Sequence, residues 1–304
     1  MPRKLRLGTR GSPLALVQAN LVKALFSAYS SDLDVEICTI KTQGDLDKKT
    51  PLSQLGGKGV FVKTLEIALL RGEIDVAVHS LKDMTSQLPD ELVLAGFIPG
   101  GSSRDVLVLK EGLSIESLPK GAKIATGSLR RKALLRTLRP EWAVTDIRGN
   151  IDTRLQKLEN GAMAGVVLAE AGLVRLGLDH RIGYRFSPEV FYPAPGQGVL
   201  ALETRGSDSD NRVLCNAISD PHQAAISTLE LLFLSHANLD CRAPLGLYTT
   251  LENQTVMMKL FLASTRMTHF LEKSFVCSET NAVTEVISFG KTAAAWFEAN
   301  SSDS

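Results

Sequence analysis

Residues 74–79 read Ile-Asp-Val-Ala-Val-His, an apolar run that ends at a histidine. Such a run predicts a buried strand of a parallel sheet whose carboxyl end opens onto a site. Residues 5–8 and 35–40 are also typical of strands, and Ser12 followed by Pro13 favours the start of a helix. This alternation of strand and helix predicts an α/β domain.

The alternation repeats after a glycine-rich segment at residues 97–104. A second segment rich in proline and glycine, residues 187–198, precedes a run that could return as a strand to the first domain. At these two segments the chain is expected to pass from one domain to the other and back, which predicts two lobes around a cleft. The remaining sequence predicts a small α+β domain. The predicted domains are residues 1–98 with 199–217, residues 99–198, and residues 218–304.

Composition limits the classes of function. The chain has 304 residues, 44% hydrophobic and 22% charged, which is typical of a soluble globular protein with several domains. The basic N-terminal residues are not followed by the apolar stretch of a signal peptide, and no run is long enough to span a membrane, so we expect a cytoplasmic protein. A net charge of +1 and 6% aromatic residues argue against binding of nucleic acid.

The four cysteines have no metal-binding or C-x-x-C spacing, so neither a disulfide framework nor a metal site is expected. Positive charge is instead concentrated between residues 121 and 160, which include nine Lys or Arg residues and only four Asp or Glu residues. Several of these arginines lie beside the expected N-terminal ends of helices, where backbone N–H groups attract anions. The pattern predicts a pocket for carboxylates or phosphates.

Two short segments could carry chemistry. Lys82 and Asp83 follow the strand that ends at His79, and a carboxylate there could act as a general acid or base or stabilise a cation. The alternative is a solvated ion pair in a turn, and His79 itself is expected to be a hydrogen-bonded structural residue. Cys241 lies in a predicted loop beside Arg242, which would favour the thiolate, although a single loop cysteine is usually inert.

These segments belong to a longer series of motifs in a fixed order. The series comprises residues 8–15, 56–59, 79–83, 128–131, 148–150, 153–155, 171–177 and 196–198 and the loop of Cys241. In order and spacing, residues 3 to 250 resemble the porphobilinogen deaminase family, also called hydroxymethylbilane synthases. The resemblance implies two periplasmic-binding-protein-like lobes around a cleft plus a small α+β C-terminal domain, and we expect a monomer.

The resemblance also implies a transferase of tetrapyrrole (haem) biosynthesis. Its substrate, porphobilinogen, carries an acetate and a propionate, which suits a site lined by arginines. Cys241 is expected to form a thioether to a dipyrromethane cofactor that primes the chain. Four further units are then added, each with loss of ammonia, and hydroxymethylbilane is released by hydrolysis. Asp83 is expected to stabilise the cation left by the departing ammonia and to shuttle protons.

Matching by position assigns the remaining residues. Cofactor contacts are expected from Lys82, Asp83, Thr126, Ser128, Arg130 and Arg131, and contacts to substrate or chain from Arg10, Ser12, Gln18, Arg148, Arg154, Arg175 and Gln197. The loop that contains Lys58 is expected to close over the site as a lid. Gln18 and Thr126 could equally be structural, and Arg136 and Arg139 match no motif, so we expect them on a solvated helix face.

The sequence departs from the family pattern near the cofactor. Leu239 and Asp240 stand in place of two glycines, Leu231 in place of an arginine, Gly127 in place of a hydroxyl residue, and Gln43 in place of a basic residue. Two alternatives therefore stay open. One is a degenerate deaminase, and the other is a non-catalytic two-lobed protein that binds a small anion, for which Asp83 and Cys241 would not need to meet.

Overall fold

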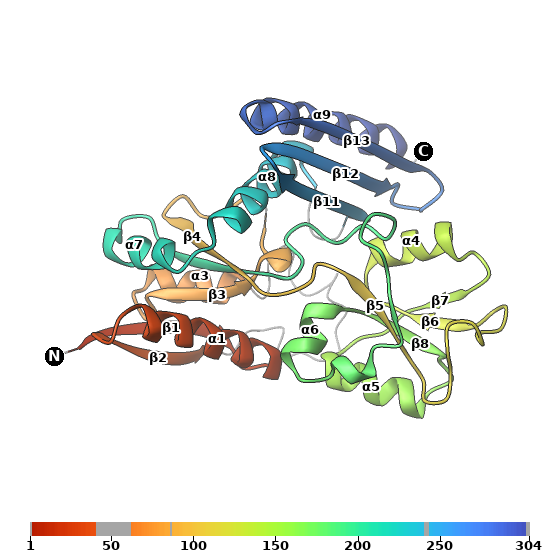
Figure 1. Ribbon diagram of the computed structural model, residues 1–304, viewed down its shortest axis with the longest axis horizontal. Coiled ribbons are helices and arrows are strands. Elements are labelled where there is room, and N and C mark those ends of the chain that lie inside the picture. The colour runs from red at the N-terminus through yellow and green to blue at the C-terminus, as the bar shows by residue number, and fades with distance from the viewer. Residues whose placement is uncertain (1, 41–61, 86, 240–242, 302–304) are drawn as a thin grey trace. The chain divides into compact units, whose positions relative to one another are not determined.

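The computed structural model describes residues 2–40, 62–85, 87–239 and 243–301 (Figure 1). The predicted lid residue Lys58 and cofactor residue Cys241 lie outside these ranges, as do Gln43 and Asp240. The chain forms two compact units, one of residues 1–100 and 199–227 and the other of residues 101–198 and 228–304.

The first unit is built on a five-stranded sheet in the order β2-β1-β3-β10-β4. Strand β1 lies between β2 and β3 and runs parallel to both, whereas β10 runs antiparallel to β3 and β4. The strands are β1 (Arg3–Arg10), β2 (Leu33–Ile40), β3 (Val76–Ser80), β4 (Leu92–Pro99) and β10 (Val199–Arg205), and the helices are α1 (Pro13–Tyr29), α3 (Lys63–Leu70) and α7 (Ser209–Ala217). The α/β class predicted from the sequence is confirmed.

Helix α1 begins where the sequence predicts. The Ser12 hydroxyl accepts a hydrogen bond from the backbone N–H of Ala15 at 3.3 Å, and Pro13 occupies the first helical position. One face of α1 is buried and packs with the strands through residues such as Val22 and Phe26. Full burial of each large apolar side chain stabilises the unit by about 1.5–3 kcal/mol.

The second unit contains a five-stranded sheet in the order β7-β6-β8-β5-β9. Strand β6 lies between β7 and β8 and runs parallel to both, and β5 is the antiparallel fourth strand. The strands are β5 (Asp105–Leu109), β6 (Lys123–Ala125), β7 (Ala143–Thr145), β8 (Gly165–Ala169) and β9 (Tyr184–Arg185). The helices that follow β6, β7 and β8 are α4 (Leu129–Leu138), α5 (Ile151–Asn160) and α6 (Glu170–Arg175), and a short 3₁₀ turn spans Asp179–Arg181.

An antiparallel three-stranded sheet also belongs to the second unit (Figure 1). It consists of β11 (Leu245–Glu252), β12 (Thr255–Ala263) and β13 (Phe270–Ser278), with helix α9 (Ala282–Ser301) and a 3₁₀ turn at Glu279–Asn281. Helix α8 (Pro221–Ala237) belongs to the second unit from residue 228 onward. Phe261 of β12 shares a hydrophobic core with Leu107 and Tyr192 of the second unit. Because of this common core the structure groups the two sheets together, and the division into three domains stays a prediction.

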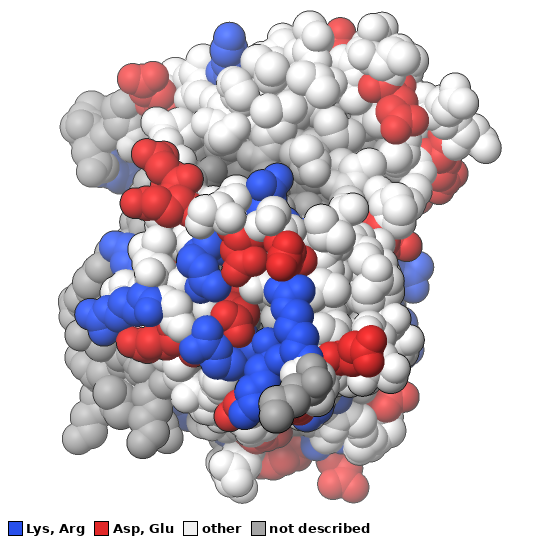
Figure 2. Space-filling view, turned by 90° about the vertical axis from the view of Figure 1, so that its left-hand side faces the viewer, with Lys and Arg blue, Asp and Glu red and all other residues white. Residues whose placement is uncertain are grey.

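Charged side chains on the face that Figure 2 shows are mixed in sign. In the first unit Arg6 pairs with Asp75 at 2.7 Å, and Arg205 pairs with Asp208 at 3.0 Å. Among the described residues, no helix is both long enough and apolar enough to cross a membrane.

Candidate functional site

In the first unit, predicted site residues gather where β1 and β3 end. Arg10 is the last residue of β1, and Ser12 caps α1. Gln18 is buried on α1, and its side-chain amide donates to the Ser80 hydroxyl at 3.0 Å. This bond joins α1 to the end of β3, and a contact of Gln18 with substrate stays a prediction.

Lys82 and Asp83 lie on a single 3₁₀ turn, Leu81–Asp83, directly after β3. The side chain of Leu81 is buried, and the Met84 N–H closes the turn by donating to the Leu81 carbonyl at 3.0 Å. Asp83 is exposed and Lys82 is half-buried. The fold therefore anchors the turn through Leu81 and leaves the Asp83 carboxylate accessible to a ligand.

His79 is a buried, hydrogen-bonded residue, as predicted. Its Nε2 atom lies 2.9 Å from Oε2 of Glu203 on the neighbouring strand β10, and the Glu203 side chain is 0% exposed. Glu66 is buried too, and burial, together with the charge of Glu203, raises its pKa. The sequence analysis missed Glu203, although a glutamate directly after the apolar run of residues 199–202 is the kind of signal that marks a buried pair.

The second unit places Arg130 and Arg131 around one buried carboxylate. Arg130 Nη1 lies 2.5 Å from Asp105 Oδ2, and Arg131 Nη2 lies 2.7 Å from Oδ1. Burial alone would raise the pKa of Asp105, but the charges and hydrogen bonds of the two guanidinium groups hold it well below its usual range. Arg130 also donates to the Tyr192 carbonyl at 2.6 Å, and Arg131 to the Val167 carbonyl at 3.0 Å.

Thr126 and Ser128 shape the turn from β6 into α4. The Ser128 hydroxyl accepts from the Arg131 N–H at 3.4 Å, and the buried Thr126 hydroxyl accepts from the Ser128 N–H at 3.2 Å. Gly127 between them has a steric role, because a Cβ atom there would lie 2.8 Å from the carbonyl oxygen of Ile147. Glycine in place of a hydroxyl residue therefore allows the backbone at residue 127 to lie close to the backbone at Ile147.

Gln197 and Arg175 meet at the turn that includes Gly198. The Gln197 side-chain amide donates to Asp105 Oδ1 at 2.9 Å and to the Ser103 carbonyl at 2.6 Å. Arg175 donates to the Gly198 carbonyl at 2.8 Å, while its buried Nε has no hydrogen-bond partner within the described ranges. Burial lowers the pKa of Arg175 to about 10. A desolvated guanidinium with a vacant donor is a favourable partner for an anion.

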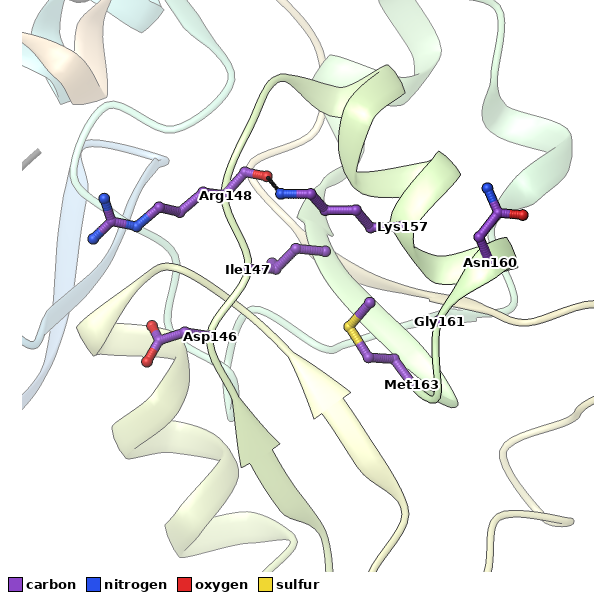
Figure 3. Close-up of a pocket in the computed structure, with 7 residues that line it drawn as sticks. All are labelled: Asp146, Ile147, Arg148, Lys157, Asn160, Gly161 and Met163. Atoms are coloured by element: carbon purple, nitrogen blue, oxygen red, sulfur yellow. Dashed lines mark hydrogen bonds between the residues drawn. The ribbon is translucent and has the colours of Figure 1, made fainter. Parts of the chain in front are cut away.

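Arg148 and Arg154 lie around the start of α5, which Asn150 caps by accepting from the Thr153 N–H at 3.0 Å. Arg154 is partly buried and donates to the Gly149 carbonyl at 2.7 Å. The exposed Arg148 forms no ion pair with any described residue, and its guanidinium extends away from Lys157 (Figure 3). Arg148 lines a pocket of about 510 Å³ together with Asp146, Ile147, Lys157, Asn160, Gly161 and Met163.

Two other arginines of the basic region behave differently. Arg136 is exposed, and its guanidinium contacts only the sulfur of Met267 among described residues, at 3.4 Å. Arg139 stacks on the Trp142 ring and pairs with Glu141 at 2.6 Å. The expectation that Arg136 and Arg139 lie outside the ligand site stays a prediction.

The segment that leads to Cys241 is described as far as Leu239. Helix α8 ends at Ala237, and Asn238 follows with a positive φ of 50°, the left-handed conformation that often terminates a helix. Leu239 is buried, whereas residues 240–242 lie outside the described part of the chain. On α8, the buried Glu230 accepts a hydrogen bond from the Gly196 N–H at 2.7 Å.

Asp105 and Glu230 are the principal site residues of the second unit that sequence reasoning missed. Both stand next to apolar runs, and a carboxylate in such a position is expected to be paired. Together with Arg130, Arg131, Gln197 and Arg175 they form one continuous set of contacts. No group of His, Cys, Asp and Glu residues that could bind a metal ion occurs within the described ranges.

Buried arginines that outnumber their acidic partners are a feature of α/β proteins suited to bind small anions. A sequence model of the family described as "Porphobilinogen deaminase, dipyromethane cofactor binding domain" matches residues 5–213. The chain belongs to the porphobilinogen deaminase family.

Curated relatives agree with this assignment. The chain is 40% identical over 264 residues to the porphobilinogen deaminase of Chlorobium phaeovibrioides, with 87% of this chain and 84% of the relative covered. It is 41% identical over 258 residues to that of Roseiflexus castenholzii, with 85% of each chain covered. Among solved structures, the methionine-binding protein MetQ shows a TM-score of 0.43 and 14% identity, covering 75% of this chain and 94% of that one.

Proposed function

We propose that this chain is an active porphobilinogen deaminase that builds hydroxymethylbilane from porphobilinogen. The observation that carries the proposal is the uneven charge around Asp105, where two buried guanidinium groups share one carboxylate. A buried positive charge in excess is costly unless an anion balances it. A carboxylate of a bound pyrrole would provide that balance.

Several residues fit the dipyrromethane cofactor named in the family description. Arg130 and Arg131 would hold its carboxylates, and the N-terminal N–H groups of α4, capped by Ser128, would add favourable dipoles. When bound through Cys241, the group supplies the free pyrrole carbon from which a chain can grow. Arg175 would bind a carboxylate through its vacant Nε, and Arg148 through its exposed guanidinium.

Asp83 is the residue we assign to proton transfer and to stabilisation of positive charge. Its turn is fixed by the buried Leu81 and the strand before it, so the carboxylate has a defined position while remaining exposed. Fixed carboxylates stabilise a developing cation without the cost of reorganising solvent. Loss of ammonia from the substrate leaves such a cation, and Asp83 would also take up and return protons during each addition.

Mass spectrometry of the intact protein tests the proposal. The purified wild type should be heavier than its sequence by two linked pyrrole units, and Cys241→Ser should remove the increment. Cys277→Ser is the matched control, because Cys277 is a free, partly exposed cysteine on β13 and should keep it. An unmodified wild type that consumes no porphobilinogen would refute the proposal in favour of a degenerate deaminase or an anion-binding protein.

We also propose the finer organisation expected from the sequence. The third domain would comprise residues 218–304, Lys58 would belong to a lid, and the protein would act as a monomer in the cytoplasm. Limited proteolysis would test the domain boundaries, and sedimentation analysis would test the monomer. A dimer that persists at nanomolar concentration would contradict it.

A further inference from the structure

Three side chains from separate elements hold the turn of residues 196–198. Glu230 of α8 accepts from the Gly196 N–H at 2.7 Å, and Arg175, at the end of α6, donates to the Gly198 carbonyl at 2.8 Å. Between these two anchors, Gln197 donates to Asp105 and lies 3.5 Å from Arg130 Nη2. The turn thus connects Glu230 with the buried arginine cluster.

The backbone of this turn is in an unusual conformation. Gly196 and Gly198 have φ angles of +69° and +94°, which side chains rarely allow. A Cβ atom on Gly198 would lie 2.9 Å from the Gly101 carbonyl oxygen. Because glycine loses more conformational freedom on ordering than other residues, the turn depends on its hydrogen bonds to stay in one conformation.

Glu230 is placed to supply the bond at the start of the turn. Its carboxyl is buried, and burial raises its pKa to about 7, although the Gly196 hydrogen bond acts in the opposite direction. Thr249 of β11 lies close, but its hydroxyl makes no well-formed hydrogen bond to the carboxyl. Within the described part of the chain, the pKa of Glu230 depends on burial, the Gly196 N–H and Thr249, and no charged side chain shifts it. Burying a carboxyl with so few partners costs free energy of folding. The hydrogen bond to the Gly196 N–H offsets part of this cost and fixes the start of the turn.

We propose that Glu230 is a positioning residue, which holds the turn at Gly196 and thereby keeps Gln197 against Asp105 and the two arginines. Without this bond, Gln197 would move and Asp105 would lose a donor. The geometry of both guanidinium groups would then loosen. The effect on catalysis rests on the proposed function, whereas the effect on the turn does not.

Nuclear magnetic resonance of the full chain tests the inference. In Glu230→Leu, which removes the acceptor at similar volume, the Gly196 amide should exchange with solvent about tenfold faster than in the wild type. Glu230→Gln keeps an acceptor oxygen and should restore exchange to within about threefold of the wild type. Glu66→Leu is the matched control, because Glu66 is buried to a similar degree, 7% exposed against 8%, and should leave the Gly196 amide unchanged.

Turnover supplies a second, separate measurement. With the cofactor content shown to be equal, Glu230→Leu should lower kcat about tenfold, and Glu230→Gln should recover it. An unchanged Gly196 exchange rate in Glu230→Leu, with an active wild type, would overturn the inference. A wild type without deaminase activity would refute the proposed function, and the exchange rates would still decide the role of Glu230.

A pH titration keeps the inference testable if Glu230→Leu does not fold. The Gly196 ¹⁵N shift of the wild type should follow protonation of the Glu230 carboxyl near neutral pH, and the curve should be flat in Glu230→Gln. A flat wild-type curve would count against the bond between the two residues.

Discussion

Replacing Asp105 with asparagine should destabilise the second unit strongly, because the substitution keeps the shape of the side chain and removes its charge. Asp105 is 0% exposed, and the side chains of Arg130 and Arg131 are 4% and 7% exposed, so solvent cannot replace the lost carboxylate. Breaking a buried ion pair costs about 3–5 kcal/mol, and here two arginines lose the same partner. That cost is a large part of the roughly 5–15 kcal/mol that stabilises a typical domain.

Urea unfolding followed by circular dichroism measures this loss directly. The control is Asp146→Asn, whose partner Lys132 lies 2.7 Å away but whose own side chain is 74% exposed. A pair so open to water contributes only about 0–1 kcal/mol. If Asp105→Asn costs no more than Asp146→Asn, the buried pair does not stabilise the fold and the reasoning from burial is wrong. Intact mass should also show reduced cofactor loading in Asp105→Asn, since the arginines would no longer be held in place.

Three further predictions concern single side chains. Arg148→Leu and Arg154→Leu should each reduce kcat/KM for porphobilinogen. The reduction should correspond to about 2–5 kcal/mol of lost transition-state stabilisation if binding desolvates the pair of arginine and substrate carboxylate. Arg136→Leu should have little effect, and equal losses in all three variants would contradict the assignment. Asp83→Asn should lower turnover about a hundredfold with little change in KM or thermal midpoint, and near-normal single-turnover release of ammonia would remove Asp83 from the mechanism. Burial raises the pKa of Glu230 from its ordinary 4.5 to about 7, so the native state keeps a proton that the unfolded chain releases. The contribution of Glu230 to the free energy of unfolding should therefore be greatest below pH 4.5 and fall by about 3 kcal/mol as pH rises to 7. Urea unfolding of wild type and Glu230→Gln, compared across this range, should show that this part of the slope is lost in the variant.

The parallel part of each sheet could be predicted because its signals are local. Strand β3 and the Ser12 cap of α1 both follow from short patterns. In contrast, β4 and β5 were not predicted, since residues 97–104 indicated only a crossing. Their pairing is set by residues far away in sequence, such as Ala201 opposite Phe97.

The same distinction applies to the site. The arginines could be identified because their charge is concentrated in one region of the sequence. Asp105, in contrast, lies 25 residues before Arg130, and Glu203 lies 124 residues after His79. Sequence shows the positive charges, but only the fold shows which of them a buried carboxylate already holds and which keep a donor for a ligand.

The position of β10 has a consequence for how the protein is synthesised. This strand lies between β3 and β4, yet it leaves the ribosome only after the whole second five-stranded sheet has been made. Until β10 is synthesised, the first sheet is incomplete, and the edges of β3 and β4 that will pair with β10 are unpaired. Unpaired strand edges are prone to associate with other chains. The second sheet, whose five strands are contiguous between Asp105 and Arg185, can close without waiting. Nascent chains stalled before residue 199 should thus contain an ordered second sheet and a first sheet that depends on chaperones.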